Sequence, residues 1–195
     1  MDESEPNHGV IEVEGDLFAA PDGAALIHAC NSQGSWGAGI ANTFRIRYPA
    51  AYRMYRVHCA RYIRRPQYQI VSSCAHGRTS RRRRLPEGTA LIIPPQEYDY
   101  EHSDKRHWII CLFTSPRFGQ NRSSPEVILE NTVFAIADMK RQLRILRVRE
   151  VEGGPAELWS CRFNSGLFGV EWRLTRSVLE DAHLDVTVVR PRGGV

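Results

Sequence analysis

The chain has 195 residues and a mass of 22.2 kDa, enough for one domain with a sizeable hydrophobic core. Its 42% hydrophobic content and mean hydropathy of -0.39 exclude a disordered chain, and no stretch is long and apolar enough to cross a bilayer. The 26 basic and 22 acidic residues give a net charge of +4, a mild excess that suits an anionic partner.

The cysteines and the N-terminus indicate the cellular compartment. The five cysteines are widely spaced and form no CxxC pair, so we expect buried or reduced thiols: Cys30, Cys59, Cys74, Cys111 and Cys161. Residues 1–6 are acidic and lack the basic and apolar regions of a secretion signal. These features predict a cytoplasmic or nuclear protein.

The first third of the chain predicts two strands followed by two helices. Residues 10–14 alternate apolar and acidic side chains, typical of a short strand that stops at Gly15-Asp16. Residues 24–30 form a continuous apolar run, which predicts a strand covered on both faces. Residues 39–62 predict two consecutive helices that meet at Tyr48-Pro49, because proline suits the first turn of a helix.

Residues 64–87 fit this scheme poorly. They contain Gly77, Pro66, Pro86 and the run Arg81–Arg84, and predict an Arg-rich surface insertion. We expect the run to be a solvated loop. A nuclear-localisation patch, a nucleic-acid contact and an electrostatic funnel at a pocket mouth are the alternatives.

The second half returns to alternating strands and helices. Strands are predicted at residues 108–113, 158–163 and 185–189, and helices at 124–146 and 170–182. Such alternation predicts one α/β domain over residues 1–195, a three-layer α/β/α sandwich with a mixed, largely parallel sheet. Ligands of such sheets bind at the carboxyl ends of the strands.

Two glycine-containing loops connect a strand to a helix at that edge. Residues 31–40 contain Gly34, Gly37 and Gly39, where backbone amides can approach a ligand and the helix N-terminus favours negative charge. Alone, such a loop is more often an empty turn. Residues 163–169 repeat the layout, and two such loops at one sheet edge predict a diphosphate held from opposite sides. Asp16 is a candidate acceptor for a purine amine, and Phe168 offers an apolar face to a ribose.

Six segments of the chain resemble the macrodomain family, most closely its branch of fungal ADP-ribose 1''-phosphate phosphatases. They are residues 15–17, 26–31, 34–41, 111–115, 124–132 and 164–172, so the resemblance covers nearly the whole chain. It implies an ADP-ribose pocket with the adenine at Asp16, the diphosphate on the backbone amides of Gly37–Ala41 and Ser165–Phe168, and the distal ribose against Asn31 and Phe168. The implied ligand-binding residues are Gly15, Asp16, Leu17, Ala29, Cys30, Asn31, Trp36, Gly37, Ala38, Gly39, Ile40, Ala41, Phe163, Asn164, Ser165, Gly166, Leu167, Phe168 and Gly169.

His28 and Asn31 are the candidate catalytic residues. His28 stands where many macrodomains have asparagine, and an imidazole near the phosphate would serve as general acid or position a water. A structural histidine at the end of a buried strand is the alternative. Cys30 has no visible His or Arg partner and is expected to be a packed thiol. Cys74, His76, His102 and His107 form no ligand set of the usual spacing, so no metal is expected.

The resemblance implies an enzyme that hydrolyses ADP-ribose 1''-phosphate, a by-product of tRNA splicing, to ADP-ribose and phosphate. A mono-ADP-ribosyl hydrolase acting on modified proteins or nucleic acids, and a module that only binds ADP-ribose, are the alternatives. A related branch relies on a lysine and an aspartate where this chain has Ser115 and Phe168, which disfavours that covalent route. We expect a monomer without a cofactor, with ADP-ribose or its 1''-phosphate as ligand, an ADP-ribosylated protein as a further candidate partner, and no membrane contact.

Overall fold

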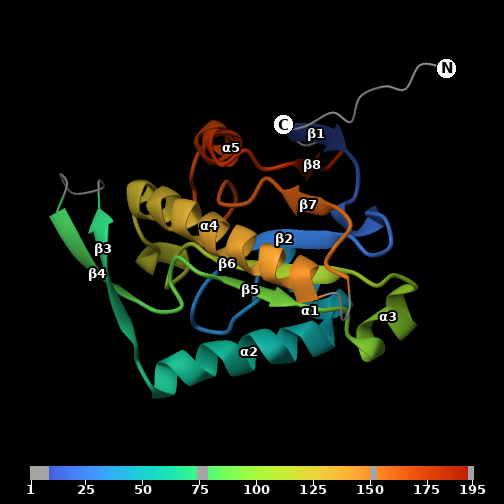
Figure 1. Ribbon diagram of the computed structural model, residues 1–195, viewed down its shortest axis with the longest axis horizontal. Helices are drawn as coiled ribbons and strands as arrows, with labels where there is room; N and C mark the ends of the chain where they lie inside the picture. The colour runs from blue at the N-terminus through green and yellow to red at the C-terminus, as the bar shows by residue number, and fades with distance from the viewer. Residues whose placement is uncertain (1–8, 74–78, 150–152, 193–195) are drawn as a thin grey trace.

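The computed structural model describes residues 9–73, 79–149 and 153–192 and contains a six-stranded sheet at its centre (Figure 1). The strand order is β1-β8-β7-β2-β6-β5. All neighbours pair in parallel except β5, which is antiparallel to β6. The strands are β1 (Val10–Glu14), β2 (Ala25–Cys30), β5 (Ala90–Ile93), β6 (Trp108–Phe113), β7 (Leu158–Cys161) and β8 (Val186–Arg190). The predicted mixed, largely parallel sheet is therefore confirmed.

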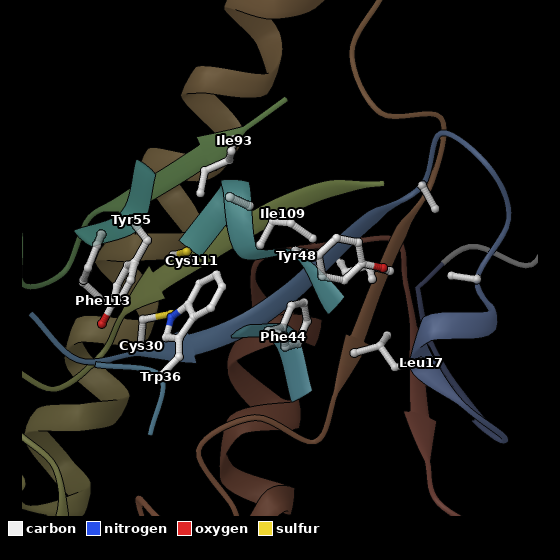
Figure 2. Close-up of a cluster of buried hydrophobic side chains, with 14 of the residues drawn as sticks. Leu17, Cys30, Trp36, Phe44, Tyr48, Tyr55, Ile93, Ile109, Cys111 and Phe113 are labelled. Atoms are coloured by element: carbon white, nitrogen blue, oxygen red, sulfur yellow. The ribbon is translucent and has the colours of Figure 1, made fainter. Parts of the chain in front are cut away.

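Helices cover both faces of this sheet and make the two outer layers. One face packs against α1 (Gly39–Arg47) and α2 (Pro49–Arg64), whose buried Phe44 and Tyr55 share a hydrophobic cluster with Ile109 of β6 (Figure 2). The other face packs against α4 (Pro125–Arg149) and α5 (Trp172–Asp181). Since both faces are covered, β2 and β6 are apolar along almost their whole length, as parallel strands between helices must be.

The predicted helices and strands are present with small shifts at their ends. Pro49 begins α2, and Tyr48 separates it from α1. β7 ends at Cys161 rather than at residue 163, and α5 begins at Trp172 rather than at residue 170. Among the described residues, β5, α3 (Glu97–Ser103) and two strands within the Arg-rich segment have no counterpart in the sequence prediction.

Part of the Arg-rich segment is a β-hairpin. β3 (Tyr68–Ser73) and β4 (Thr79–Arg84) form a two-stranded antiparallel sheet outside the main sheet (Figure 1). Arg81–Arg84 were expected in a solvated loop, but all four lie in strand β4. Arg82 and Arg84 are solvated and Arg81 and Arg83 are not, because alternate strand residues face opposite sides. Arg83 is only 4% exposed and stacks on Phe134, while Arg81 pairs with Glu87 and Glu130.

No helix in the described part of the chain combines the length and apolarity that a membrane span requires.

Candidate active site

A cavity of about 1150 Å³ lies at the carboxyl ends of the parallel strands. Its walls come from the segments that follow β1, β2, β6, β7 and β8 and from the first turn of α1. A second cavity of about 930 Å³ lies at the opposite edge, between α4 and the amino ends of β1, β7 and β8. Because ligands of open α/β sheets bind at the carboxyl edge, the first cavity is the candidate active site.

The loop after β2 is held in shape by the side chain of Asn31. Its Nδ2 donates to the Ser35 carbonyl at 2.6 Å, and its Oδ1 accepts from the Gln33 amide at 2.9 Å and from the Tyr55 hydroxyl at 3.1 Å. Asn31 is 7% exposed. These bonds make Asn31 a residue that shapes the loop, and they leave its second amide hydrogen for a ligand.

The N-terminus of α1 opens into the cavity without a capping side chain. The N-cap residue is Ala38, which makes no side-chain hydrogen bond, and Gly39, Ile40 and Ala41 line the cavity. Uncapped amides at a helix N-terminus carry partial positive charge and bind anions. Gly39 has φ +57, and a Cβ there would meet Leu167 at 3.4 Å, so this turn favours glycine.

The loop after β7 faces α1 across the cavity and is anchored by Asn164. Asn164 is 3% exposed with φ 66. Its Oδ1 accepts from the Thr114 hydroxyl at 2.9 Å, and its Nδ2 donates to the Thr132 hydroxyl at 2.9 Å. These bonds tie the residue 163–168 loop to α4 and to the end of β6.

Asp16 lies at the far end of the cavity, where β1 ends. Its Oδ1 accepts from the Phe18 amide at 3.0 Å, and its Oδ2 lies 3.9 Å from Arg47. Of the described residues that line the cavity, Asp16 is the one carboxylate, and none is a histidine or a lysine. Two arginines also line it, but Arg162 pairs with Glu12 and Arg190 with Glu14.

Comparison with known proteins identifies the fold and the family. The chain matches no protein-family model. It is 58% identical to an ADP-ribose 1''-phosphate phosphatase of Aspergillus fumigatus over the full length of both chains. It is 58% identical to one of Aspergillus clavatus, over 97% of this chain and 98% of that one. The macrodomain of Mycobacterium tuberculosis DarG superposes with a TM-score of 0.63 at 19% identity, covering 95% of this chain and 99% of that one.

The chain belongs to the macrodomain family of fungal ADP-ribose 1''-phosphate phosphatases. Every ligand-binding residue predicted for this macrodomain lines the cavity except Gly169. Gly169, the last residue of the predicted loop, does not line the cavity, and an added Cβ there would meet the Arg122 guanidinium at 3.1 Å.

Other residues that line the cavity of this macrodomain were not predicted: Phe18, Ser35, Phe118, Cys161, Arg162, Val189, Arg190 and Pro191. Phe18, Ser35 and Arg162 adjoin predicted positions and were within reach of the sequence pattern. Phe118 comes from the segment after β6. The sequence shows that β6 is buried but does not show that the following loop bends back over the cavity.

His28 is buried beside the cavity rather than in its wall. Its side chain is 0% exposed, lies parallel to the Phe44 ring at 4.1 Å between centroids, and meets Trp36 edge-on at 4.9 Å. Ala29 and Cys30, the last two residues of β2, line the cavity, whereas His28 lies deeper in the strand and is covered by Phe44 and Trp36. This geometry does not support the expected general-acid role, and it favours the structural alternative.

Cys30 does have a histidine neighbour, contrary to the expectation from sequence. Its Sγ lies 3.5 Å from Nε2 and 3.7 Å from Nδ1 of His28. The strand register places Cys111 opposite His28, and ligand atoms of all three side chains lie within 4.8 Å of one another. Burial raises the pKa of the Cys30 thiol well above its usual range. The Cys30 sulfur is nearly equidistant from both ring nitrogens of His28, and all three side chains are buried among hydrophobic residues, so we interpret the group as packed core.

The other histidines considered for a metal are bonded to backbone or lie outside the described residues. His102 Nδ1 contacts the Tyr98 carbonyl, and His107 Nε2 contacts the Ala20 carbonyl. Cys74 and His76 lie outside the described residues.

Proposed function

We propose that this macrodomain is an ADP-ribose 1''-phosphate phosphatase that releases phosphate and ADP-ribose. The observation that carries the proposal is the 58% identity over full length to fungal proteins of that name. The cavity supports it, because the loop that leads into the uncapped N-terminus of α1 and the loop after β7 line the same cavity at the carboxyl edge of the sheet, where backbone amides favour an anionic ligand.

The proposed site binds through backbone groups rather than through side-chain cations. The uncapped amides at Gly39–Ala41 would hold the diphosphate from one side and the residue 165–168 loop from the other. The arginines in the wall are already paired with Glu12 and Glu14, so they add little free positive charge. The indole N–H of Trp36 lacks an acceptor among the described residues and is a further donor.

Hydrolysis requires that a water oxygen bonds to phosphorus, that the bond from phosphorus to the anomeric oxygen breaks, and that a proton lost by the water is balanced by one taken up by the anomeric oxygen. Because no described histidine or lysine lines the cavity, we propose that positioning and preorganised donors supply most of the rate enhancement. Asn31 acts there as a positioning residue, since its bonds hold the loop that carries Ser35 and Trp36.

A steric block at Gly166 tests this site. An added Cβ at Gly166 meets nothing within 4 Å, so Gly166→Leu is compatible with the fold and places its side chain at the cavity wall. We expect it to abolish phosphate release from ADP-ribose 1''-phosphate, measured colorimetrically with ADP-ribose quantified by chromatography. The matched control is Gly154→Leu at the opposite edge of the sheet, which should retain activity. Equal activity in both variants would place the reaction elsewhere.

The two alternatives give different results with the same protein. A mono-ADP-ribosyl hydrolase would release ADP-ribose from ADP-ribosylated glutamate faster than phosphate from the 1''-phosphate. A binding module would show heat on titration with ADP-ribose and no turnover of either substrate.

A cytoplasmic or nuclear location is also part of the proposal, and the free thiols of Cys30, Cys59, Cys111 and Cys161 suit it.

A further inference from the structure

Charge is divided unevenly along the chain. Residues 23–86 contain 12 arginines and not one of the 22 acidic residues. The remaining sequence carries 14 basic and all 22 acidic side chains, so the modest net charge of +4 conceals a strongly basic segment and an acidic remainder. In the fold, this basic segment includes β2, α1, α2, β3 and β4.

The solvent side of α2 concentrates this charge. Arg53, Arg56, Arg61 and Arg64 are all exposed, and Arg65 follows at the helix end. At 100° per residue these arginines fall within one half of the helix circumference, and Arg53 and Arg64 lie about 16 Å apart along the axis. Val57 lies among them and is 71% exposed.

The outer face of the hairpin continues this surface. Arg82 and Arg84 are exposed and share that face with Tyr68 and Ile70. Arg84 Nη2 donates to the Tyr62 carbonyl of α2 at 3.4 Å, which joins the two elements. The Arg82 guanidinium lies 3.7 Å from the centre of the half-exposed Tyr68 ring.

The arginines of this surface lack acidic partners within the described residues. No ion pair there involves Arg56, Arg61, Arg64, Arg65, Arg82 or Arg84. At the other end of α2 the surface stops, because Arg53 lies over Tyr98 of the acidic helix α3. We call these six arginines with Tyr68 the arginine surface.

We propose that the arginine surface binds a single-stranded nucleic acid. Guanidinium groups match phosphate in a bidentate geometry and stack on bases, and all six cations are arginine rather than lysine. Tyr68 offers a ring on which a base can stack, as in surfaces that bind single strands. None of these residues lines the cavity, so this activity is separate from the proposed phosphatase reaction.

The test uses fluorescence anisotropy of a labelled single-stranded RNA of about 16 nucleotides, with single-stranded DNA of the same sequence as a second probe. Arg56, Arg61, Arg64 and Arg65 are replaced together by glutamine. We expect binding at least tenfold weaker than wild type. The slope of log affinity against log salt should fall by about 3, since each lost phosphate contact removes about 0.7 for a single strand. Tyr68→Ala should weaken binding with little change in the salt slope.

The control variant loses the same charge elsewhere. Arg141, Arg144, Arg147 and Arg173 are exposed on α4 and α5, and their joint replacement by glutamine should leave RNA binding near wild type. Equal losses in both variants would reduce the effect to net charge and overturn the proposal. The proposal would also be overturned if the wild type did not bind RNA or if ADP-ribose displaced the RNA. It would likewise be overturned if the protein bound phosphatidylserine vesicles and RNA did not compete for that binding. Titration with ADP-ribose should give the same affinity for both variants and the wild type.

Discussion

Asn164 joins two loops of the cavity through one buried carboxamide. Its bonds with Thr114 and Thr132 are both made inside the core, and its backbone has φ 66. Asn164→Ala removes both bonds and forces alanine into the left-handed region, so we expect a loss of roughly 2–4 kcal/mol of unfolding free energy. Urea denaturation measures it, and affinity for ADP-ribose should weaken in parallel.

Asn164→Gly separates the two causes. Glycine adopts the positive φ without strain but makes neither bond, so its loss should be smaller than that of alanine, roughly 1–3 kcal/mol. If glycine and alanine destabilise equally, backbone strain contributes nothing at this position.

The place of a residue in the site could be predicted from sequence where its backbone shapes a loop. It was harder to predict where the role of the residue depends on what its side chain contacts. Gly37, Gly39 and Gly166 line the cavity as the glycine pattern indicates. His28 could not be placed from sequence, because its burial depends on Phe44 and Trp36, which come from other segments and pack around its ring.

A largely buried cluster of charges, which includes Glu130 of α4, attaches the hairpin to the rest of the fold. Arg81 Nη1 lies 3.1 Å from Glu87 and Nη2 3.1 Å from Glu130, and Nη2 also donates to Asn131 at 2.8 Å. Asn131 donates in turn to the Thr114 carbonyl next to the cavity loop. Removing one member of a largely buried ion cluster leaves the other charges poorly compensated, so Arg81→Gln should lower the unfolding free energy by roughly 2–4 kcal/mol.

Hydrogen exchange should locate this effect. Arg81→Gln is expected to lower protection of the amides in β3 and β4 more than in β2. The matched control is Arg82→Gln on the opposite face of the same strand, where an exposed cation contributes about 0.5 kcal/mol or less. Equal effects of the two changes would show that Arg81 does not anchor the hairpin.

Elements with a strong apolar pattern could be predicted, and those formed by polar pairing could not. β2, β6 and α4 follow from uninterrupted or helically spaced apolar residues. β4 consists largely of arginine, and its inward residues are buried by partners on α4 that are remote in sequence. β5 has only four residues before Pro94-Pro95, too few for a periodic signal.

At the scale of the whole molecule, partly buried His58 and buried His107 are two described histidines whose protonation opposes folding. Burial lowers the pKa of His58, which stacks on Phe113 at 5.4 Å, and the Arg61 charge lowers it further. Burial likewise lowers the pKa of His107, which contacts the Tyr48 hydroxyl at 2.7 Å and the Ala20 carbonyl at 3.0 Å. In both cases the unfolded chain takes up a proton at higher pH than the folded chain does.

Stability should therefore be complete above the ordinary histidine pKa of about 6.5 and fall as the pH drops below it. Each proton bound only by the unfolded chain lowers the unfolding free energy by up to about 1.4 kcal/mol per pH unit. Glu12 adds a separate loss below its ordinary value of 4.5: burial raises its pKa, but the Trp172 N–H and the Arg162 and Arg176 charges outweigh this and lower it overall. Urea denaturation from about pH 8 to pH 5 measures the histidine effect, and His58→Gln and His107→Gln should each flatten the slope. A stability that stays constant between pH 7 and pH 5 in the wild type would show that neither histidine is held neutral by the fold.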